Sequence, residues 1–347
     1  MSGLLLAIDI GTTGTKACVF TPEGNTVASE YQEYGCTYPR PGWVEQDAEA
    51  LVQAAYATAG GVMKKIGVDA AGVKAVSFST QRTCSIFLDR EGNLVRPMIS
   101  WMDNRPVDEV KEIEEKLGGE RFHLITGLPL NTTWNLGKLM WLRRNEPENW
   151  KKMARFCQLQ DFILLRFGSD GHYTDAGAVG LTGMWDIRAF DWCDEILNAF
   201  SIDKSILPVA VVPGTRVGTI SPVIAEKTGI PTGVAIVVGA GDQHSAIVGA
   251  GVIEAGRLSV SLGTGGLVGA YMEDTRPARP ACLPGSPNRS RGWKERLRHR
   301  RGNRFIAFWT RWRQRRRRDR GECCSCPISP VPALRAGILT RAGVFSG

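Results

Sequence analysis

Polar residues and glycine-threonine turns follow apolar segments at several points in this sequence. Asp9 lies inside the apolar run Leu4–Ile10, which leads into the turn Gly11–Gly14. A carboxylate in a buried strand is costly unless its charge is compensated, and a hydrated magnesium ion can do this together with phosphate oxygens. The turn offers backbone N–H groups that can cradle a phosphate. The segment equally fits a plain hairpin with a solvent-facing aspartate, and it lacks the Walker A spacing.

A second carboxylate, Asp242, follows the apolar segment Ala235–Gly239. At the end of a strand and the start of a helix, it could act as a general base toward a hydroxyl, or simply cap the helix. A second glycine-threonine turn occurs in Ser261–Gly266. Two such turns with Asp242 between them indicate two related domains that face one polyphosphate.

These residues need strands and helices to position them, and the apolar patterns predict both. Strands are predicted over Leu4–Ile10, Thr15–Phe20, Thr26–Glu30, Val73–Ser79, Ser85–Leu88, Ala235–Gly239, Leu258–Leu262 and Leu267–Tyr271. Helices are predicted between the cap Asp47 and the closing Gly67, and over Pro106–Leu117 and Leu136–Asn145. Because a hairpin and a third strand precede the first helix, the order indicates an α/β domain with a mixed sheet rather than a strict βαβ alternation.

The composition is that of a folded protein large enough for two domains. The chain has 347 residues, of which 43% are hydrophobic and 22% are charged. It holds no run of eighteen apolar residues, so no transmembrane helix is predicted. The apolar N-terminus carries no basic region ahead of it, which argues against a signal peptide and for the cytoplasm. Five cysteines scattered through the first 275 residues show no paired spacing, as expected of buried reduced thiols.

The net charge of +8 divides unevenly along the chain. Residues 276–347 hold 19 of the 43 Lys and Arg residues and 3 of the 35 acidic ones, whereas residues 1–275 carry a net charge of −8. The abrupt change favours an out-of-frame translation of G+C-rich coding sequence, or a disordered tail. A genuine basic arm that binds RNA or DNA is an alternative, because its arginines alternate with aromatic residues. A metal site from Cys323, Cys324, Cys326 and His299 fits no zinc spacing.

Seven segments together resemble the FGGY carbohydrate kinases, which belong to the superfamily of actin, sugar kinases and heat-shock ATPases. In the order of the family, the matching segments are Ala7–Lys16, Ser79–Arg82, Ser100–Arg105, Lys138–Leu142, Gln160–Phe162, Gly239–Gln243 and Ser261–Gly266. The resemblance covers residues 1–275. It implies an α/β, ribonuclease H-like (actin-like ATPase) domain with a mixed sheet, followed by the start of a second such domain and a basic tail foreign to the family.

The resemblance also implies domain boundaries. Residues 1–250 would be the N-terminal sugar-binding domain, residues 251–275 the first strands of a nucleotide domain, and residues 276–347 the arginine-rich tail. In this interpretation the chain is truncated after its second phosphate motif. Its partners would be a sugar or polyol and ATP, with no membrane, with nucleic acid only through the tail, and with a second copy of the chain as a candidate.

The activity implied is ATP-dependent phosphorylation of a sugar or polyol hydroxyl with Mg²⁺, impaired by the truncation. Asp242 would be the base that takes the hydroxyl proton, and Asp9 would help to position the magnesium ion. The two phosphate turns would contain Thr12, Thr13 and Lys16, and Gly263, Thr264 and Gly265. The substrate pocket would use Gln81, Arg82, Thr83, Trp101, Asp242 and Gln243.

The substrate suggested by the resemblance is a ketopentose such as xylulose. Gln81 and Arg82 look like the glycerol kinase pattern, but Thr83 stands where a glutamate follows in that group. A xylulose kinase typically has a Met-His pair here, which Arg82 and Thr83 do not match. Glycerol or gluconate specificity is one alternative, and an inactive kinase domain with a nucleic-acid-binding tail is the other.

Overall fold

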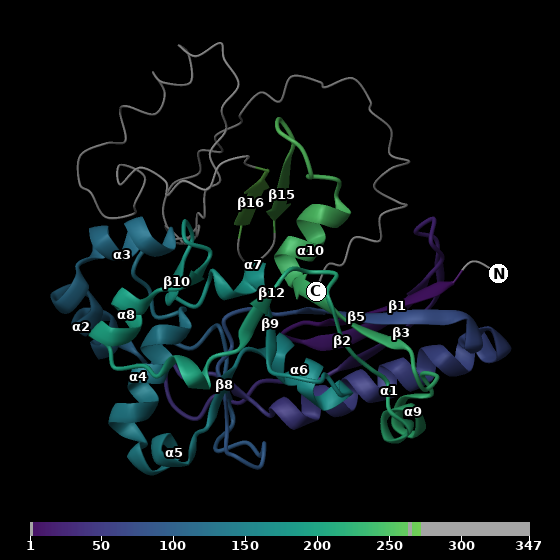
Figure 1. Cartoon of the computed structure of the whole chain (residues 1–347), viewed down its shortest axis with the longest axis horizontal. Coiled ribbons are helices and arrows are strands. Elements are labelled where there is room, and N and C mark those ends of the chain that lie inside the picture. The colour runs from purple at the N-terminus through teal and green to yellow at the C-terminus, as the bar shows by residue number, and fades with distance from the viewer. Residues whose placement is uncertain (1–2, 263–265, 272–347) are drawn as a thin grey trace, which may run out of the picture. The chain divides into compact units, whose positions relative to one another are not determined.

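The structure is a computed structural model that describes residues 3–262 and 266–271. Its centre is a six-stranded mixed sheet in the order β13-β14-β5-β1-β2-β3 (Figure 1). The strands are β1 (Leu4–Ile10), β2 (Gly14–Phe20), β3 (Thr26–Glu33), β5 (Val73–Thr80), β13 (Arg216–Thr219) and β14 (Ala235–Gly241). β1, β5 and β14 are parallel, and the other neighbours are antiparallel. The sheet therefore has the mixed character that the sequence predicts.

Helix α1 (Ala48–Ile66) lies across one face of this sheet. Asp47 caps it by accepting hydrogen bonds from the N–H groups of Glu49 and Ala50, and Gly67 ends it with a φ of 56° that suits glycine. Both predicted ends are thus confirmed. The helices α6 (Leu159–Phe167) and α9 (Pro222–Thr228) pack beside α1 on the same face, and all three share one apolar core with the sheet.

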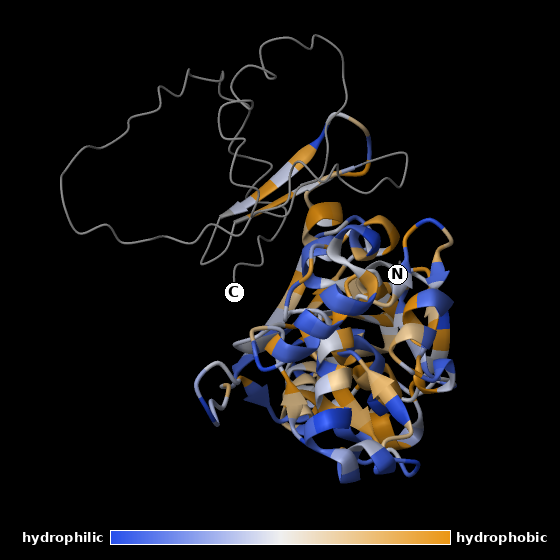
Figure 2. Ribbon diagram, turned by 90° about the vertical axis from the view of Figure 1, so that its left-hand side faces the viewer, coloured by the Kyte–Doolittle hydropathy of each residue, from blue (hydrophilic) through white to orange (hydrophobic). Residues whose placement is uncertain are grey.

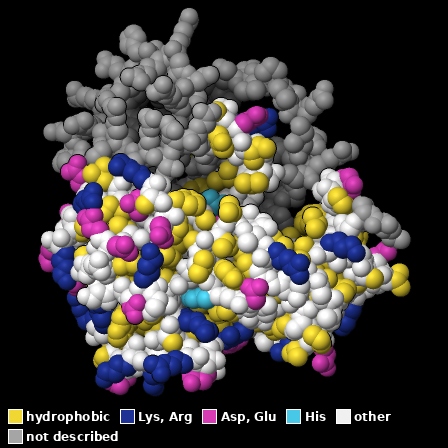
Figure 3. Space-filling model, in the orientation of Figure 1, with side chains coloured by type: hydrophobic (Ala, Val, Ile, Leu, Met, Phe, Trp, Pro, Cys, Tyr) yellow, Lys and Arg dark blue, Asp and Glu magenta, His cyan; other side chains and the backbone are white. Residues whose placement is uncertain are grey.

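A helical subdomain between β6 and residue 207 builds a second core, rich in Phe and Trp (Figure 1). Its helices are α2 (Val107–Leu117), α3 (Gly119–Thr126), α4 (Asn135–Asn145), α5 (Pro147–Lys152) and α8 (Asp194–Ala199). The predicted helices at Pro106–Leu117 and Leu136–Asn145 are confirmed to within one residue at their starts. In the view of Figure 3, acidic and basic side chains alternate over the surface of this subdomain.

Short elements connect these parts. The two-stranded pairs are β4 (Glu45–Gln46) with β7 (Met98–Ile99), β6 (Ile86–Leu88) with β8 (Arg155–Cys157), β9 (Tyr173–Asp175) with β12 (Val209–Val211), and β10 (Trp185–Asp186) with β11 (Asp191–Trp192). The remaining helices are η1 (Gly67–Gly72), α7 (Ala176–Val179), η2 (Lys204–Ile206) and α10 (Asp242–Gly249). Figure 2 shows hydrophobic residues concentrated on the inner strands and helices.

Two compact units divide the described residues within α10, between Ser245 and Ala246. The second unit contains the hairpin of β15 (Leu258–Leu262) and β16 (Gly266–Ala270), in which Leu258 pairs with Ala270. The strand predicted at Leu258–Leu262 is confirmed, and its partner begins one residue earlier than predicted. None of the helices in the described ranges is long and apolar enough to cross a membrane.

Candidate active site

The carboxyl ends of three parallel strands bring the predicted polar residues to one edge of the sheet. Asp9 is the penultimate residue of β1, where it pairs with Ser79 of β5. Gln81 and Arg82 directly follow β5, and Asp242 directly follows β14. Since β5 lies between β1 and β14, Asp9 and Asp242, which are 233 positions apart in the sequence, converge here, as ligand sites do at the carboxyl edge of open α/β sheets.

Arg82 and Asp242 form the central ion pair of this edge. Nε of Arg82 donates to Oδ1 of Asp242 at 3.0 Å, with 12% and 33% of the two side chains exposed. A Cβ at Gly241 would lie 2.4 Å from Cδ of Arg82, so only glycine lets the arginine cross the strand. Burial lowers the pKa of Arg82, and the charge of Asp242 opposes that effect. The pair is therefore held by the fold and is more than a loose surface contact.

The Asp242 carboxylate keeps one oxygen for a ligand. Oδ1 also accepts a hydrogen bond from the N–H of Gln243 at 2.6 Å. Within the described part of the chain, both hydrogen bonds to this carboxylate thus end on Oδ1. Oδ2 has no such contact among these residues, so it could accept a proton from a hydroxyl. The capping and catalytic interpretations of Asp242 are compatible, because its contact with the start of α10 uses only Oδ1.

Asp9 lies half-buried in the same edge. Burial raises the pKa of Asp9, the nearby charge of Asp242 adds to the rise, and a hydrogen bond from Ser79 and the charge of Lys16 oppose it. A carboxylate whose charge is disfavoured by burial and by a second carboxylate suits a hydrated magnesium ion, which takes one or two carboxylates and completes its shell with water and phosphate oxygens. No cluster of three or more His, Cys, Asp or Glu side chains that could hold a metal occurs in the described ranges.

The first glycine-threonine turn joins β1 to β2. It is closed by a hydrogen bond from the N–H of Gly11 to the carbonyl of Gly14 at 2.9 Å, and the hydroxyl of Tyr34 donates to the Gly11 carbonyl at 2.8 Å. A Cβ at Gly14 would lie 2.4 Å from the Tyr31 hydroxyl oxygen. Thr13 is exposed at the tip of the turn, and Lys16 lies in β2 opposite Asp9.

A chain of hydrogen bonds ties this turn to Trp101. The indole N–H of Trp101 donates to the Thr12 hydroxyl at 2.9 Å, which in turn donates to Oε1 of Gln81 at 3.0 Å. Nε2 of Gln81 donates to Oε1 of Gln46 at 2.9 Å. Gln81 is only 2% exposed, so the structure gives it a supporting place beneath the site. Trp101 stays partly exposed and can offer its ring to a ligand.

Thr83 has a strained backbone. Its φ of 59° lies in the left-handed region, which β-branched residues rarely adopt. Its hydroxyl donates to the Arg82 carbonyl at 2.7 Å, its N–H donates to Gln158 at 3.3 Å, and the residue is 4% exposed. The buried Thr83 side chain is thus turned to the protein, whereas its backbone sets the direction of the neighbouring Arg82.

The sequence analysis missed two residues beside the Arg82–Asp242 pair. Asp175 caps α7 and accepts a hydrogen bond from the N–H of Gly241 at 3.1 Å. Burial lowers the pKa of His244, whose Nδ1 is buried without a hydrogen-bond partner among the described residues. The cap signal of Asp175 ahead of Ala-Gly-Ala is visible in the sequence, but its contact with β14 depends on the tertiary fold.

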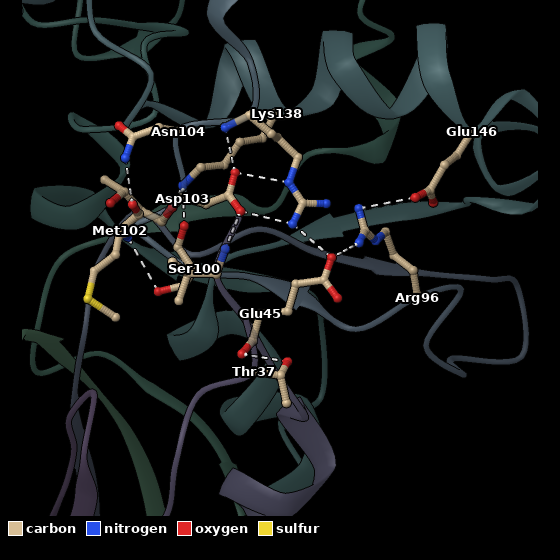
Figure 4. A network of polar contacts seen from close by, with 12 residues as sticks. Thr37, Glu45, Arg96, Ser100, Met102, Asp103, Asn104, Lys138 and Glu146 are labelled. Carbon is tan, nitrogen blue, oxygen red and sulfur yellow. Dashed lines mark hydrogen bonds and ion pairs between the residues drawn. The ribbon is translucent and has the colours of Figure 1, made fainter. Parts of the chain in front are cut away.

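A buried network of charges anchors the segment that carries Trp101 (Figure 4). Nη2 of Arg105 donates to Glu45 at 2.7 Å and to Asp103 at 2.9 Å. Glu45 also pairs with Arg96, and Oδ2 of Asp103 accepts from the N–H of Val44 at 2.6 Å. The side chains of Arg105 and Asp103 are both 0% exposed. Because each charge has a partner, the network fixes the loop without leaving a buried charge uncompensated.

Some predicted site residues cannot be placed. Gly263, Thr264 and Gly265 of the second turn lie outside the described residues, as does the basic tail from residue 276 onward. Among the described residues, the structure brings together Asp9, Thr12, Gln81, Arg82, Trp101 and Asp242.

Comparison with known proteins gives this geometry a context. The model of the N-terminal domain of the FGGY family of carbohydrate kinases matches residues 4–249. The xylulose kinase of Lactococcus lactis is 30% identical over 267 residues, which cover 77% of this chain and 53% of that kinase. Glycerol kinase 1 of Pseudomonas aeruginosa is 31% identical over 271 residues, which cover 76% of this chain and 54% of that enzyme.

Solved structures agree on the fold. The xylulose kinase of Rhodospirillum rubrum superposes with a TM-score of 0.76 at 24% identity, over 80% of this chain and 56% of that one. The gluconate kinase of Lactobacillus acidophilus does so with a TM-score of 0.73 at 24% identity, over 77% and 53%. These likenesses confirm the predicted actin-like ATPase fold. The chain spans about half the length of the curated relatives it matches.

Proposed function

The chain belongs to the FGGY family of carbohydrate kinases, and we propose that its sheet edge serves the ATP-dependent phosphorylation of a sugar or polyol hydroxyl. One observation carries the proposal. The ion pair of Arg82 and Asp242 lies on the same carboxyl edge as Asp9, so a proton acceptor, a hydrogen-bond donor and a carboxylate for magnesium meet at one place. The relatives named xylulose, glycerol and gluconate kinase support the reaction class.

The proposed mechanism assigns proton removal to Asp242. Its Oδ2 takes the proton of the attacking hydroxyl, while Arg82 orients the carboxylate through its hydrogen bond to Oδ1. Asp9 would hold a hydrated Mg²⁺, which would neutralise charge on the phosphate oxygens of ATP, the donor of the phosphoryl group. Thr12, Thr13 and Lys16 would belong to the first phosphate turn, and Gly263, Thr264 and Gly265 to the second. In-line positioning of the hydroxyl and the phosphoryl group would be the main contribution of the protein.

We propose a ketopentose such as xylulose as the substrate. The partly exposed ring of Trp101 can stack on carbon-bound hydrogens, and Arg82 and Gln243 can donate to hydroxyls. Thr83, which stands where glycerol kinases have a glutamate, turns its side chain to the protein and adds no carboxylate to the pocket. Glycerol and gluconate remain the alternatives, because relatives of both the xylulose and glycerol groups are about equally similar.

We also propose the domain boundaries that the sequence indicates. Residues 1–250 would form the sugar-binding domain, and residues 251–275 would begin the nucleotide domain. The cytoplasmic location, a homodimer, and contact of the tail with nucleic acid stay predictions from the sequence.

Phosphoryl transfer by the full chain tests the function. The protein is incubated with MgATP and one of xylulose, glycerol or gluconate, and the phosphorylated product is measured by mass spectrometry. We expect product from one of them, and a rate about 100- to 10,000-fold lower for Asp242→Asn, which cannot accept the proton. Asp69→Asn, on the exposed surface of η1, is the matched control and should match the wild type. ATP consumption that is independent of sugar would contradict the proposal.

A further inference from the structure

Lys138 is a buried cation that the proposed mechanism does not use. It lies in the first turns of α4, and it is 0% exposed. Its Nζ donates one hydrogen bond to the carbonyl of Thr83 and one to the carbonyl of Ser100, each at 2.8 Å. Lys138 and Ser100 are labelled in Figure 4. Burial lowers the pKa of Lys138 to about 8, while Cys84 and Asp103 raise it and Arg105 lowers it further. Burial of an ammonium group costs free energy, so we expect Lys138 to have a role that compensates for this cost.

The two carbonyls belong to the two segments that carry the proposed sugar contacts. Thr83 directly follows Arg82, and Ser100 directly precedes Trp101. The segments come from different parts of the chain, after β5 and after β7, and Lys138 bonds to both. One side chain therefore fixes the separation between the turn that presents the guanidinium and the turn that presents the indole.

The Thr83 carbonyl is attached to the strained backbone described above. A β-branched residue with a φ of 59° relaxes toward an extended conformation unless contacts hold it. Such a relaxation would rotate the peptide that joins Arg82 to Thr83. Asn135, one turn earlier on α4, supports the same segment by donating to the Cys84 carbonyl at 3.0 Å and to the Ser85 hydroxyl at 2.8 Å. Polar side chains at the start of α4 thus hold the segment that contains Thr83 in place.

We propose that Lys138 is a positioning residue of the sugar site, which clamps the Arg82–Thr83 turn and the Ser100–Trp101 turn together through their backbone carbonyls. The inference rests on the proposed function. It assigns to Lys138 the preorganisation of two sugar contacts, since a site that is loose by about 1 Å can lose about 100-fold in rate. Lys138 itself does not touch the sugar.

The test measures sugar affinity by calorimetry with the full chain. Lys138→Met removes both hydrogen bonds and keeps much of the volume, and we expect it to weaken binding about tenfold or more. Glycine adopts a positive φ without strain, so Thr83→Gly should make the clamp dispensable. Adding Lys138→Met to Thr83→Gly should then weaken binding by only about threefold or less relative to Thr83→Gly alone. An equal loss in both backgrounds would overturn the proposal.

Arg143 provides a matched control on the same helix. Its Nη1 donates to the carbonyls of Phe200 at 2.6 Å and of Ser201 at 3.2 Å, and Ser201 also has a positive φ of 52°. Arg143→Met therefore removes the same kind of contact away from the proposed site. It should leave sugar affinity within about twofold of the wild type. A loss as large as that of Lys138→Met would show a general effect on α4 and overturn the proposal.

Two further arms keep the test decisive. If Lys138→Met does not fold, Lys138→Gln replaces it in the same cycle, because its amide can still donate but reaches less far. If the wild type binds no sugar, the proposed function fails, and hydrogen–deuterium exchange over residues 82–84 and 100–102 judges the clamp separately. Faster exchange of both segments in the Lys138 variant alone supports the clamp, and unchanged exchange overturns it.

Discussion

Arg82 reaches Asp242 across a glycine. Nε of Arg82 lies 3.0 Å from Oδ1 of Asp242, and any Cβ at position 241 would lie 2.4 Å from Cδ of the arginine. The same glycine donates its N–H to Asp175 at 3.1 Å. The end of β14 is therefore shaped to place one guanidinium against one carboxylate, and this placement underlies the proposed proton transfer.

Gly241→Ala tests this arrangement without replacing Arg82 or Asp242. The added methyl should push the Arg82 side chain away from Asp242, and we expect sugar affinity to fall about tenfold or more. Calorimetric titration measures the affinity, and circular dichroism checks the fold. Gly60→Ala in α1 is the control, because its Cβ would make an ordinary contact of 3.7 Å with the Thr228 carbonyl. Equal affinity in the two variants would contradict the role of Gly241.

Thr12→Val tests the link between the first turn and Trp101. Valine has nearly the shape of threonine but lacks the hydroxyl, so the Trp101 indole N–H loses its acceptor and Gln81 loses a donor. We expect the free energy of unfolding to fall by about 1–3 kcal/mol, together with a loss of sugar affinity. Urea denaturation measures the stability. Thr21→Val, whose hydroxyl accepts from the N–H of Asn25 and bonds to the exposed Glu23, should cost far less.

Asp9→Asn should increase stability and decrease function. Burial raises the pKa of Asp9 above its ordinary value of 3.8, so the folded state binds its proton more tightly than the unfolded state does. The charged form is therefore penalised once the pH rises through the raised pKa, and the penalty is absent below the ordinary value. At about pH 7, without MgATP, we expect the unfolding temperature to rise by about 2–4 °C.

The pH dependence distinguishes this origin from a packing effect. The gain of Asp9→Asn should shrink as the pH falls through the raised pKa of Asp9, where Asp9 of the wild type takes up its proton. The stabilisation that MgATP gives to the wild type should also be lost in the variant. A gain that stays constant from acid to neutral pH would refute the electrostatic explanation. Asp69→Asn is again the surface control.

Glu45→Gln tests the buried network behind Trp101. The Glu45 carboxylate is shared by Arg96 and Arg105, whose side chains are 6% and 0% exposed. Removal of its charge leaves two buried guanidinium groups short of a partner, and we expect a loss of about 3–5 kcal/mol in the free energy of unfolding. Glu49→Gln breaks a more exposed pair with Arg166 and should cost about 0–1 kcal/mol. Similar losses in chemical denaturation would contradict the predicted difference.

Local signals allowed much of the scaffold to be predicted from the sequence. The strand Leu4–Ile10 has the predicted bounds because its apolar run is continuous, and α1 does because Asp47 and Gly67 mark its ends. The strand Ala235–Gly239 extends to Gly241, since its last two residues pair with Ser79 and Thr80 of β5. That extension depends on a neighbour more than 150 positions away in the sequence, which no local pattern reveals.

The contacts of the residues that support the site could not be predicted from local sequence patterns either. Gln46 has no distinctive motif and Asp175 shows only a helix-cap signal. Their contacts with Gln81 and Gly241 arise only when separate segments meet. Lys138 is part of a segment that resembles the family, but its burial against two carbonyls contradicts the usual exposure of lysine. The charged residues that could take part in the reaction can be identified from the sequence. The backbone contacts that orient them can be identified only in the folded structure.

The most direct test of the account is whether Arg82 binds the sugar. Calorimetric titration of the full chain with xylulose, glycerol and gluconate should show binding of one of them, and Arg82→Met should weaken it by about 10- to 100-fold. Arg90→Met, in the turn after β6, should bind like the wild type. Binding of no sugar by the wild type, or undiminished binding by Arg82→Met, would contradict a sugar site at this edge of the sheet.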